Sequence, residues 1–168
     1  MPTIQSSIEI MAPTSQVFAL AQDYQLRLEW DPFVREMRFL DGATETAVGV
    51  RVWVRAKNGF SMQVRFITLK APEQVAMTMV EGPKIFRQFS GAWLFKPIDE
   101  GRTRATFRYH FTTRPRLLSV VMDPVLERIL QKDMDARLAA LKTSIETTDI
   151  LERLPGAAGR AEGPTCDG

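Results

Sequence analysis

The chain has almost none of the residues on which disulfides, zinc sites and histidine catalysis depend. Its 168 residues include one cysteine, Cys166, and one histidine, His110. A single cysteine cannot form a disulfide within the chain, and the usual zinc sites need more nitrogen and sulfur ligands than these two residues supply. The acidic residues also lack a spacing typical of magnesium or calcium sites. The sequence therefore predicts no metal and no other cofactor.

Long apolar runs and a strong charge of one sign are lacking as well. No stretch approaches the roughly 18 consecutive apolar residues of a membrane span, and the N-terminus lacks the basic flank and apolar block of a signal peptide. The net charge of +2 is too small to indicate a nucleic-acid partner. We therefore expect a cytoplasmic protein, although a transient contact with a membrane surface stays compatible with the sequence.

What is present is the composition of a globular domain. Hydrophobic residues make up 45% of the chain and charged residues 25%, which is enough apolar material for a core. The last residues, from Pro155, are small, polar and rich in glycine and proline, and such segments bury too little apolar surface to fold. The sequence predicts one domain over residues 1–150 and a disordered tail over residues 151–168.

Seven segments alternate between apolar and polar residues, as strands with one buried face do. The alternation is clearest at Val50, Val52 and Val54, which share one face while arginines and a tryptophan occupy the other. Asn58-Gly59, a strong hairpin signal, separates this segment from the next. The predicted strands cover residues 4–11, 33–40, 49–55, 60–66, 75–79, 85–97 and 104–111, mostly joined by short turns into an antiparallel sheet.

Helical patterns occupy two regions of the chain. Between the first two strands, Pro13-Thr14-Ser15 opens a short helix. Asp23-Tyr24 either ends that helix or begins a second one, and residues 24–30 are too short a stretch to assign by periodicity. After the last strand, apolar residues spaced by three or four predict a long amphipathic helix over residues 124–147. Residues 117–122 then form either a separate helical turn or an extension of that helix kinked at Pro124.

Five short motifs occur in an order that is typical of one known fold. They are Ile8-Glu9-Ile10-Met11-Ala12-Pro13, Trp30-Asp31-Pro32, Gly91-Ala92-Trp93-Leu94-Phe95-Lys96-Pro97, Gly101-Arg102-Thr103 and Leu138-Ala139-Ala140-Leu141-Lys142. Over about residues 3–147 the chain resembles the START-like (SRPBCC) superfamily, and within it the polyketide cyclase/dehydrase and lipid-transport branch. The resemblance implies an α+β helix-grip fold, in which a curved seven-stranded antiparallel sheet wraps around a long C-terminal helix and two short helices lie between the first and second strands. Members carry lipids, quinones, hormones or polyketides, and some cyclise or dehydrate them, so the fold alone does not give the function.

A curved sheet over a single helix leaves an apolar cavity, the usual form of a small-molecule site. Eight methionines suit a pocket that adapts to irregular guests, and they suit the gaps of an ordinary core equally well. The expected lining is Val50, Val52, Val64, Phe66, Met77, Met79, Phe89, Trp93, Tyr109 and Phe111 from the sheet, Leu118, Met122, Val125 and Ile129 from the helix, and Trp30 at the rim.

Arg87 and Tyr109 are the polar candidates on the expected inward face. Strict alternation places Arg87 with Phe89 and Trp93, where a guanidinium needs a partner such as a ligand oxygen. A strand that begins slightly later leaves Arg87 at the rim, with its charge in water. The hydroxyl of Tyr109 suits a ligand carbonyl or a backbone group of the core.

Two other residues have competing interpretations. Asp31 is a candidate catalytic acid, but Asp-Pro pairs more often cap turns, and we favour a corner between a helix and a strand. His110 alternates with Tyr109 and Phe111, so we place it on the polar face, away from any reaction.

The outer face of the sheet is predicted to be basic. It carries Arg51, Arg55, Arg65, Arg104 and Arg108 together with Trp53. A basic stripe with an aromatic residue can meet an anionic surface. The low net charge favours an ordinary solvated face with acidic residues nearby.

The sequence supports three functions. The first is binding or transport of a small hydrophobic ligand, such as a lipid, a quinone or a polyketide-like aromatic. The second is a cyclase or dehydratase in which Arg87 and Tyr109 polarise a carbonyl, and the third is a protein-interaction module that uses the basic face. Because the strands offer no inward histidine or carboxylate as a proton acceptor, we favour binding over catalysis.

Overall fold

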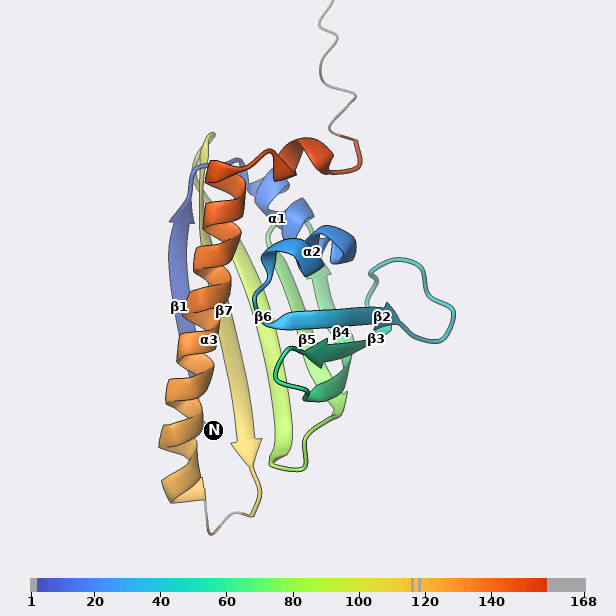
Figure 1. Cartoon of the computed structure of the whole chain (residues 1–168), viewed down its shortest axis with the longest axis vertical. Coiled ribbons are helices and arrows are strands. Elements are labelled where there is room, and N and C mark those ends of the chain that lie inside the picture. The colour runs from blue at the N-terminus through green and yellow to red at the C-terminus, as the bar shows by residue number, and fades with distance from the viewer. Residues whose placement is uncertain (1–2, 116, 118, 157–168) are drawn as a thin grey trace, which may run out of the picture.

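The computed structural model describes residues 3–115, 117 and 119–156, and it confirms the predicted α+β fold. Seven antiparallel strands form one sheet with the order β1-β7-β6-β5-β4-β3-β2. The long helix α3 (Ser119–Thr147) lies along β1 and β7, and two short helices lie near its C-terminal end (Figure 1). The other elements are β1 (Thr3–Ile10), α1 (Thr14–Gln22), α2 (Tyr24–Trp30), β2 (Val34–Phe39), β3 (Arg51–Ala56), β4 (Ser61–Lys70), β5 (Gln74–Glu81), β6 (Phe86–Asp99) and β7 (Arg102–Thr113). Within the described residues, no helix is long and apolar enough to cross a membrane.

The buried face of the sheet follows the predicted period of two. In β7, Phe107, Tyr109 and Phe111 are buried, while the residues between them are only half-buried. His110 therefore lies on the outer face, as predicted, where its Nδ1 is 2.8 Å from the hydroxyl oxygen of Thr3. This contact belongs to the pairing of β1 with β7, which joins the first strand to the last.

The two halves of α3 pack differently against the sheet. In the C-terminal half, Leu138 and Leu141 are almost completely buried. In the N-terminal half, Val125 and Ile129 expose 54% and 58% of their surface, so the close contact expected for this half is not made at these two residues. Pro124 lies inside one continuous helix that begins at Ser119. Residues 119–122 are therefore an extension of the long helix and not a separate helical turn.

The folded chain continues past residue 150. Ile150–Arg153 form one turn of 3₁₀ helix, η1, and Ile150 is buried in the core. Arg153 donates two hydrogen bonds of 2.7 Å to the carboxylate of Glu29 and so ties this turn to α2. The domain boundary expected at residue 150 falls at the start of this turn. Residues 157–168 of the predicted tail lie outside the described part of the chain.

We predict that Leu141→Ala lowers the free energy of unfolding by about 2–5 kcal/mol, because it opens a cavity at a fully buried position. The matched change Ile129→Ala, on the exposed half of the same helix, should cost less than about 0.5 kcal/mol. Urea denaturation at pH 7 measures both values. Equal costs for the two substitutions would contradict the unequal packing of α3.

Candidate functional site

A cavity of about 230 Å³ lies between the inner face of the sheet and α3. Its wall is largely apolar and takes side chains from α2 and the corner after it, from strands β2 to β7, from α3 and from the loops that follow β3 and β5. From the N-terminal half of α3, Leu126, Ile129 and Leu130 border this space without filling it.

Seven of the residues predicted to line a cavity do so: Val64, Met77, Met79, Phe89, Trp93, Tyr109 and Ile129. The others do not: Trp30, Val50, Val52, Phe66, Arg87, Phe111, Met122 and Val125 are absent from the wall, and Leu118 lies outside the described residues. Several of these fill the core instead, because α2 covers part of the inward face. Tyr24 of α2 stacks on Phe66 with ring centres 6.4 Å apart, and Trp30 lies edge-on behind Trp93 at 6.4 Å.

Arg87 is exposed and is not among the residues of the cavity wall, which agrees with the rim alternative. The pairing of β6 with β7 is irregular at this point, since Phe86 is opposite Thr113 and Gln88 is opposite Thr112. Two residues of β6 thus advance while β7 advances by one, which is a β-bulge and shifts the alternation. The bulge turns Phe86, rather than Arg87, into the cavity wall.

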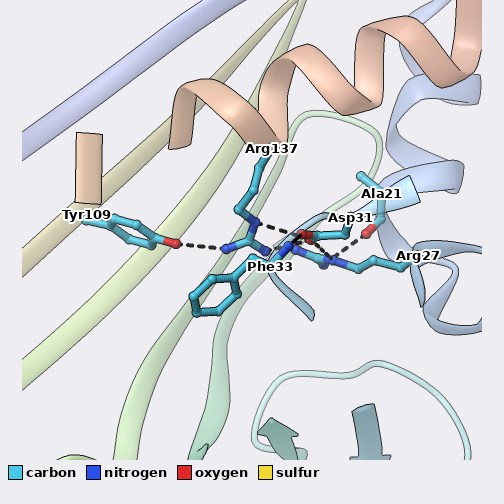
Figure 2. A network of polar contacts seen from close by, with 6 residues as sticks. All are labelled: Ala21, Arg27, Asp31, Phe33, Tyr109 and Arg137. Carbon is cyan, nitrogen blue, oxygen red and sulfur yellow. Dashed lines mark hydrogen bonds and ion pairs between the residues drawn. The ribbon is translucent and has the colours of Figure 1, made fainter. Parts of the chain in front are cut away.

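The polar end of the cavity is built around Asp31, at the corner between α2 and β2. The side chain is fully buried, and its Oδ1 accepts a hydrogen bond of 3.0 Å from the backbone N–H of Phe33. Its Oδ2 accepts from Nε of Arg27 at 3.1 Å and from Nε and Nη2 of Arg137 at 3.2 and 2.8 Å (Figure 2). Arg27 also donates to the carbonyl of Ala21 at 3.1 Å. The interpretation of Asp31 as a corner is confirmed, and Asp31 is in addition the counter-ion of two buried arginines.

Arg137 is held by contacts on its edges and its faces. Besides its bonds to Asp31, its Nη1 donates to the hydroxyl oxygen of Tyr109 at 2.9 Å (Figure 2). The centre of the guanidinium lies 4.9 Å from the ring centres of both Phe33 and Phe107, close enough for cation–π attraction. The guanidinium is therefore fixed in one orientation at the inner end of the cavity.

Burial and ion pairing set the pKa values at this end of the cavity. Burial alone would raise the pKa of Asp31, but Arg137, Arg27 and the amide of Phe33 outweigh it and hold that pKa below its ordinary value. Burial raises the pKa of Tyr109 to about 12, with Arg137 partly opposing it. Asp133, one helical turn before Arg137, has a raised pKa, mainly because of burial. At neutral pH Asp31 is thus ionised and Tyr109 keeps its proton.

Arg27, Asp133 and Arg137 are wall residues that the sequence analysis does not identify. The sequence does indicate that Arg137 is buried, because this residue lies three positions after Met134 and four before Leu141, on the buried side of α3. A charged residue on the apolar side of a helix must find a partner. What the sequence cannot show is that the partner comes from the corner after α2.

The basic outer face of the sheet has the acidic neighbours that a solvated face would have. Arg51 pairs with Asp41 at 2.7 Å, and Arg104 pairs with Glu9 at 3.0 Å. Trp53 is covered by the guanidinium of Arg38, 4.3 Å from its ring centre. These contacts favour the solvated-face interpretation over a docking surface.

Comparisons with known proteins agree with this architecture. The family model for polyketide cyclase/dehydrase and lipid transport matches residues 1–146, while no curated protein sequence matches the chain. Similar solved structures include XoxI from Bacillus cereus, with a TM-score of 0.73, 14% identity and coverage of 88% of this chain and 97% of that one. A START superfamily protein from Mycobacterium smegmatis has a TM-score of 0.71 and 11% identity over 86% and 97% of the two chains. The Zhui aromatase/cyclase from a Streptomyces species has a TM-score of 0.68 and 18% identity over 87% and 96%. At these identities the likeness concerns the fold alone.

We predict that Asp31→Asn lowers the free energy of unfolding at pH 7 by roughly 3–5 kcal/mol, because two buried arginines lose their shared counter-ion. The matched change Asp41→Asn removes the partner of Arg51 in solvent and should have little effect. Chemical denaturation of the three proteins measures the difference. Similar stabilities for the two variants would contradict the central place of Asp31.

The ion pairs of Asp31 with Arg27 and Arg137 should also make the stability of the protein depend on pH in the acid range. The folded-state pKa of Asp31 lies below the unfolded value of about 3.9. Its contribution to stability is therefore present above about pH 4 and is lost as the pH falls through the folded-state pKa. Asp133, whose pKa is raised mainly by burial and to a smaller extent by Asp31, acts in the opposite direction. Because burial is common to both proteins, most of this effect cancels in their comparison. Between about pH 5 and pH 3 the unaltered protein should lose more stability than Asp31→Asn, and parallel pH profiles would count against this assignment.

Proposed function

This chain belongs to the polyketide cyclase/dehydrase and lipid-transport family, and we propose that it binds a small hydrophobic molecule in the cavity between the sheet and α3. The cavity itself carries the proposal. Protein interiors pack closely and leave few voids larger than a water molecule, whereas about 230 Å³ remains open here behind an apolar wall. A space of this kind is the usual form of a small-molecule site.

The volume favours a compact guest. An apolar cavity of roughly 150 Å³ takes up benzene, so about 230 Å³ suits a substituted ring or two fused rings. Phe60 and Ile129 both line the cavity and are 60% and 58% exposed, which places the opening beside them. Among the ligands expected from the sequence, a quinone or a polyketide-like aromatic suits this volume better than a long-chain lipid.

The polar groups favour binding over catalysis. A mechanism in which Arg87 and Tyr109 together polarise a carbonyl is not supported, because Arg87 is exposed and lies outside the cavity wall. With a pKa of about 12, Tyr109 is a hydrogen-bond donor at neutral pH rather than a base. Arg27 and Arg137 share Asp31 as their counter-ion, so their charge is already balanced within the protein.

We predict that the protein binds 2-methylnaphthalene saturably, with one molecule per chain, and that Met77→Trp weakens this binding by roughly tenfold or more. Met77 lies in the cavity wall, and the larger indole should occupy the space that the guest needs. The matched control is Ile67→Trp on β4, where the side chain is 47% exposed and outside the wall. Fluorescence titration measures the affinities, and thermal melts establish that both variants fold.

Native mass spectrometry of gently purified protein adds a second test, because a retained molecule would identify the chemical class of the guest. The proposal fails if the unaltered protein binds neither 2-methylnaphthalene nor its hydroxyl analogue 2-naphthol. It also fails if Met77→Trp folds and binds this hydrocarbon as tightly as Ile67→Trp does.

A further inference from the structure

One carboxylate in the cavity wall has a buried oxygen without a hydrogen-bond partner. Asp133 lies on the side of α3 that lines the cavity, together with Leu126, Leu130 and Arg137. Its Oδ2 is buried and receives no hydrogen bond from any residue that the structure describes. An unpaired buried acceptor is costly, so its presence in a cavity wall points to a donor on the guest.

The arginine one turn further along the helix does not fill this need. Residues at i and i+4 of a helix commonly form ion pairs, but Arg137 directs Nε and Nη2 to Asp31 and Nη1 to Tyr109. Asp133 thus stands beside the network that ties α3 to α2 without being hydrogen-bonded to it. Its carboxylate is left for a group that enters the cavity.

Tyr109 offers the complementary hydrogen bond. Its hydroxyl oxygen accepts from Arg137 at 2.9 Å, and no acceptor for its own hydrogen lies among the described residues. Tyr109 is 5% exposed and lines the same cavity as Asp133, and the charge of Asp133 is near enough to help raise the pKa of this phenol. A donor and an acceptor therefore lie close together at one end of an apolar cavity.

The charges at this end balance. Arg27 and Arg137 carry two positive charges, and the carboxylates of Asp31 and Asp133 carry two negative charges when ionised. A guest with a carboxylate or an ammonium group would upset this balance at the cost of its own desolvation. A neutral polar group that can both donate and accept fits the site without adding charge.

We infer that Asp133 and Tyr109 together recognise a hydroxyl group, whether phenol, enol or alcohol, on an otherwise apolar and neutral guest. The guest hydroxyl donates its hydrogen to the carboxylate of Asp133 and accepts the hydrogen of Tyr109. This assignment rests on the proposed function, because it names the chemical class of the molecule that the cavity binds.

The test compares three probes of nearly equal shape. In 2-naphthol the substituent donates and accepts hydrogen bonds, in 2-methoxynaphthalene it only accepts, and in 2-methylnaphthalene it does neither. The unaltered protein should bind 2-naphthol roughly ten- to a hundredfold more tightly than 2-methylnaphthalene, as expected for a hydrogen bond to a charged group. This comparison requires no variant, so it decides even where a substitution impairs folding.

Two variants separate the two hydrogen bonds. Asp133→Asn should weaken binding of 2-naphthol by roughly tenfold and leave both other probes within about twofold. Tyr109→Phe should weaken 2-naphthol and 2-methoxynaphthalene but not 2-methylnaphthalene. The matched control is Asp135→Asn, an exposed aspartate of the same helix that accepts from Gln131 at 3.2 Å, and it should change none of the three affinities.

The possible failures are distinct. Equal affinity of the unaltered protein for 2-naphthol and 2-methylnaphthalene would overturn the hydroxyl assignment and leave the proposed function standing. A loss of 2-naphthol binding in Asp135→Asn as large as in Asp133→Asn would also overturn it. If none of the three probes binds, the proposed function fails, and the assignment of Asp133 and Tyr109 fails with it.

Discussion

The buried carboxylate of Asp31 connects parts of the chain that are far apart in the sequence. It terminates α2, accepts the first amide hydrogen bond of the turn into β2, and pairs with arginines from α2 and α3. Through Arg137 the connection reaches Tyr109 on β7. A charge this deeply buried is costly unless every neighbour is correctly placed. The position of α3 relative to the corner is therefore set by charge as well as by packing.

This arrangement also decides where the cavity ends. Arg137 lies near the middle of α3, between the half that packs tightly and the half that does not. On one side of it, Leu138 and Leu141 close the core, and on the other side Leu130 and Ile129 border the open space. We interpret the network as a device that specifies the placement of the helix, since buried ion pairs often add little net stability.

The architecture could be predicted from the sequence because its signals are local. Alternation along β3 and β7 and the spacing of apolar residues in α3 depend only on near neighbours. The cavity wall could be predicted only in outline. Phe66 and Met77 both point inward, but whether such a residue faces open space or α2 depends on tertiary packing. Strict alternation places Arg87 on the inward face, but a bulge inserts one residue into the count. Asp31 and Arg137 are 106 positions apart, and no local pattern connects them.

The uneven burial of α3 separates how fast a guest leaves from how stable the fold is. Proteins open locally at free energies well below that of global unfolding, and poorly buried segments open most easily. Leu126 and Ile129, in the N-terminal half of α3, line the cavity, and the exposed turn before them contributes little to the core. This half can therefore move aside while the Asp31 network and the C-terminal turns stay in place. Under the proposed function, the residence time of a guest depends on the first half of the helix, and the thermal stability depends on the second half. Substitutions in the N-terminal half can then change the rate of ligand exchange without lowering the stability of the fold.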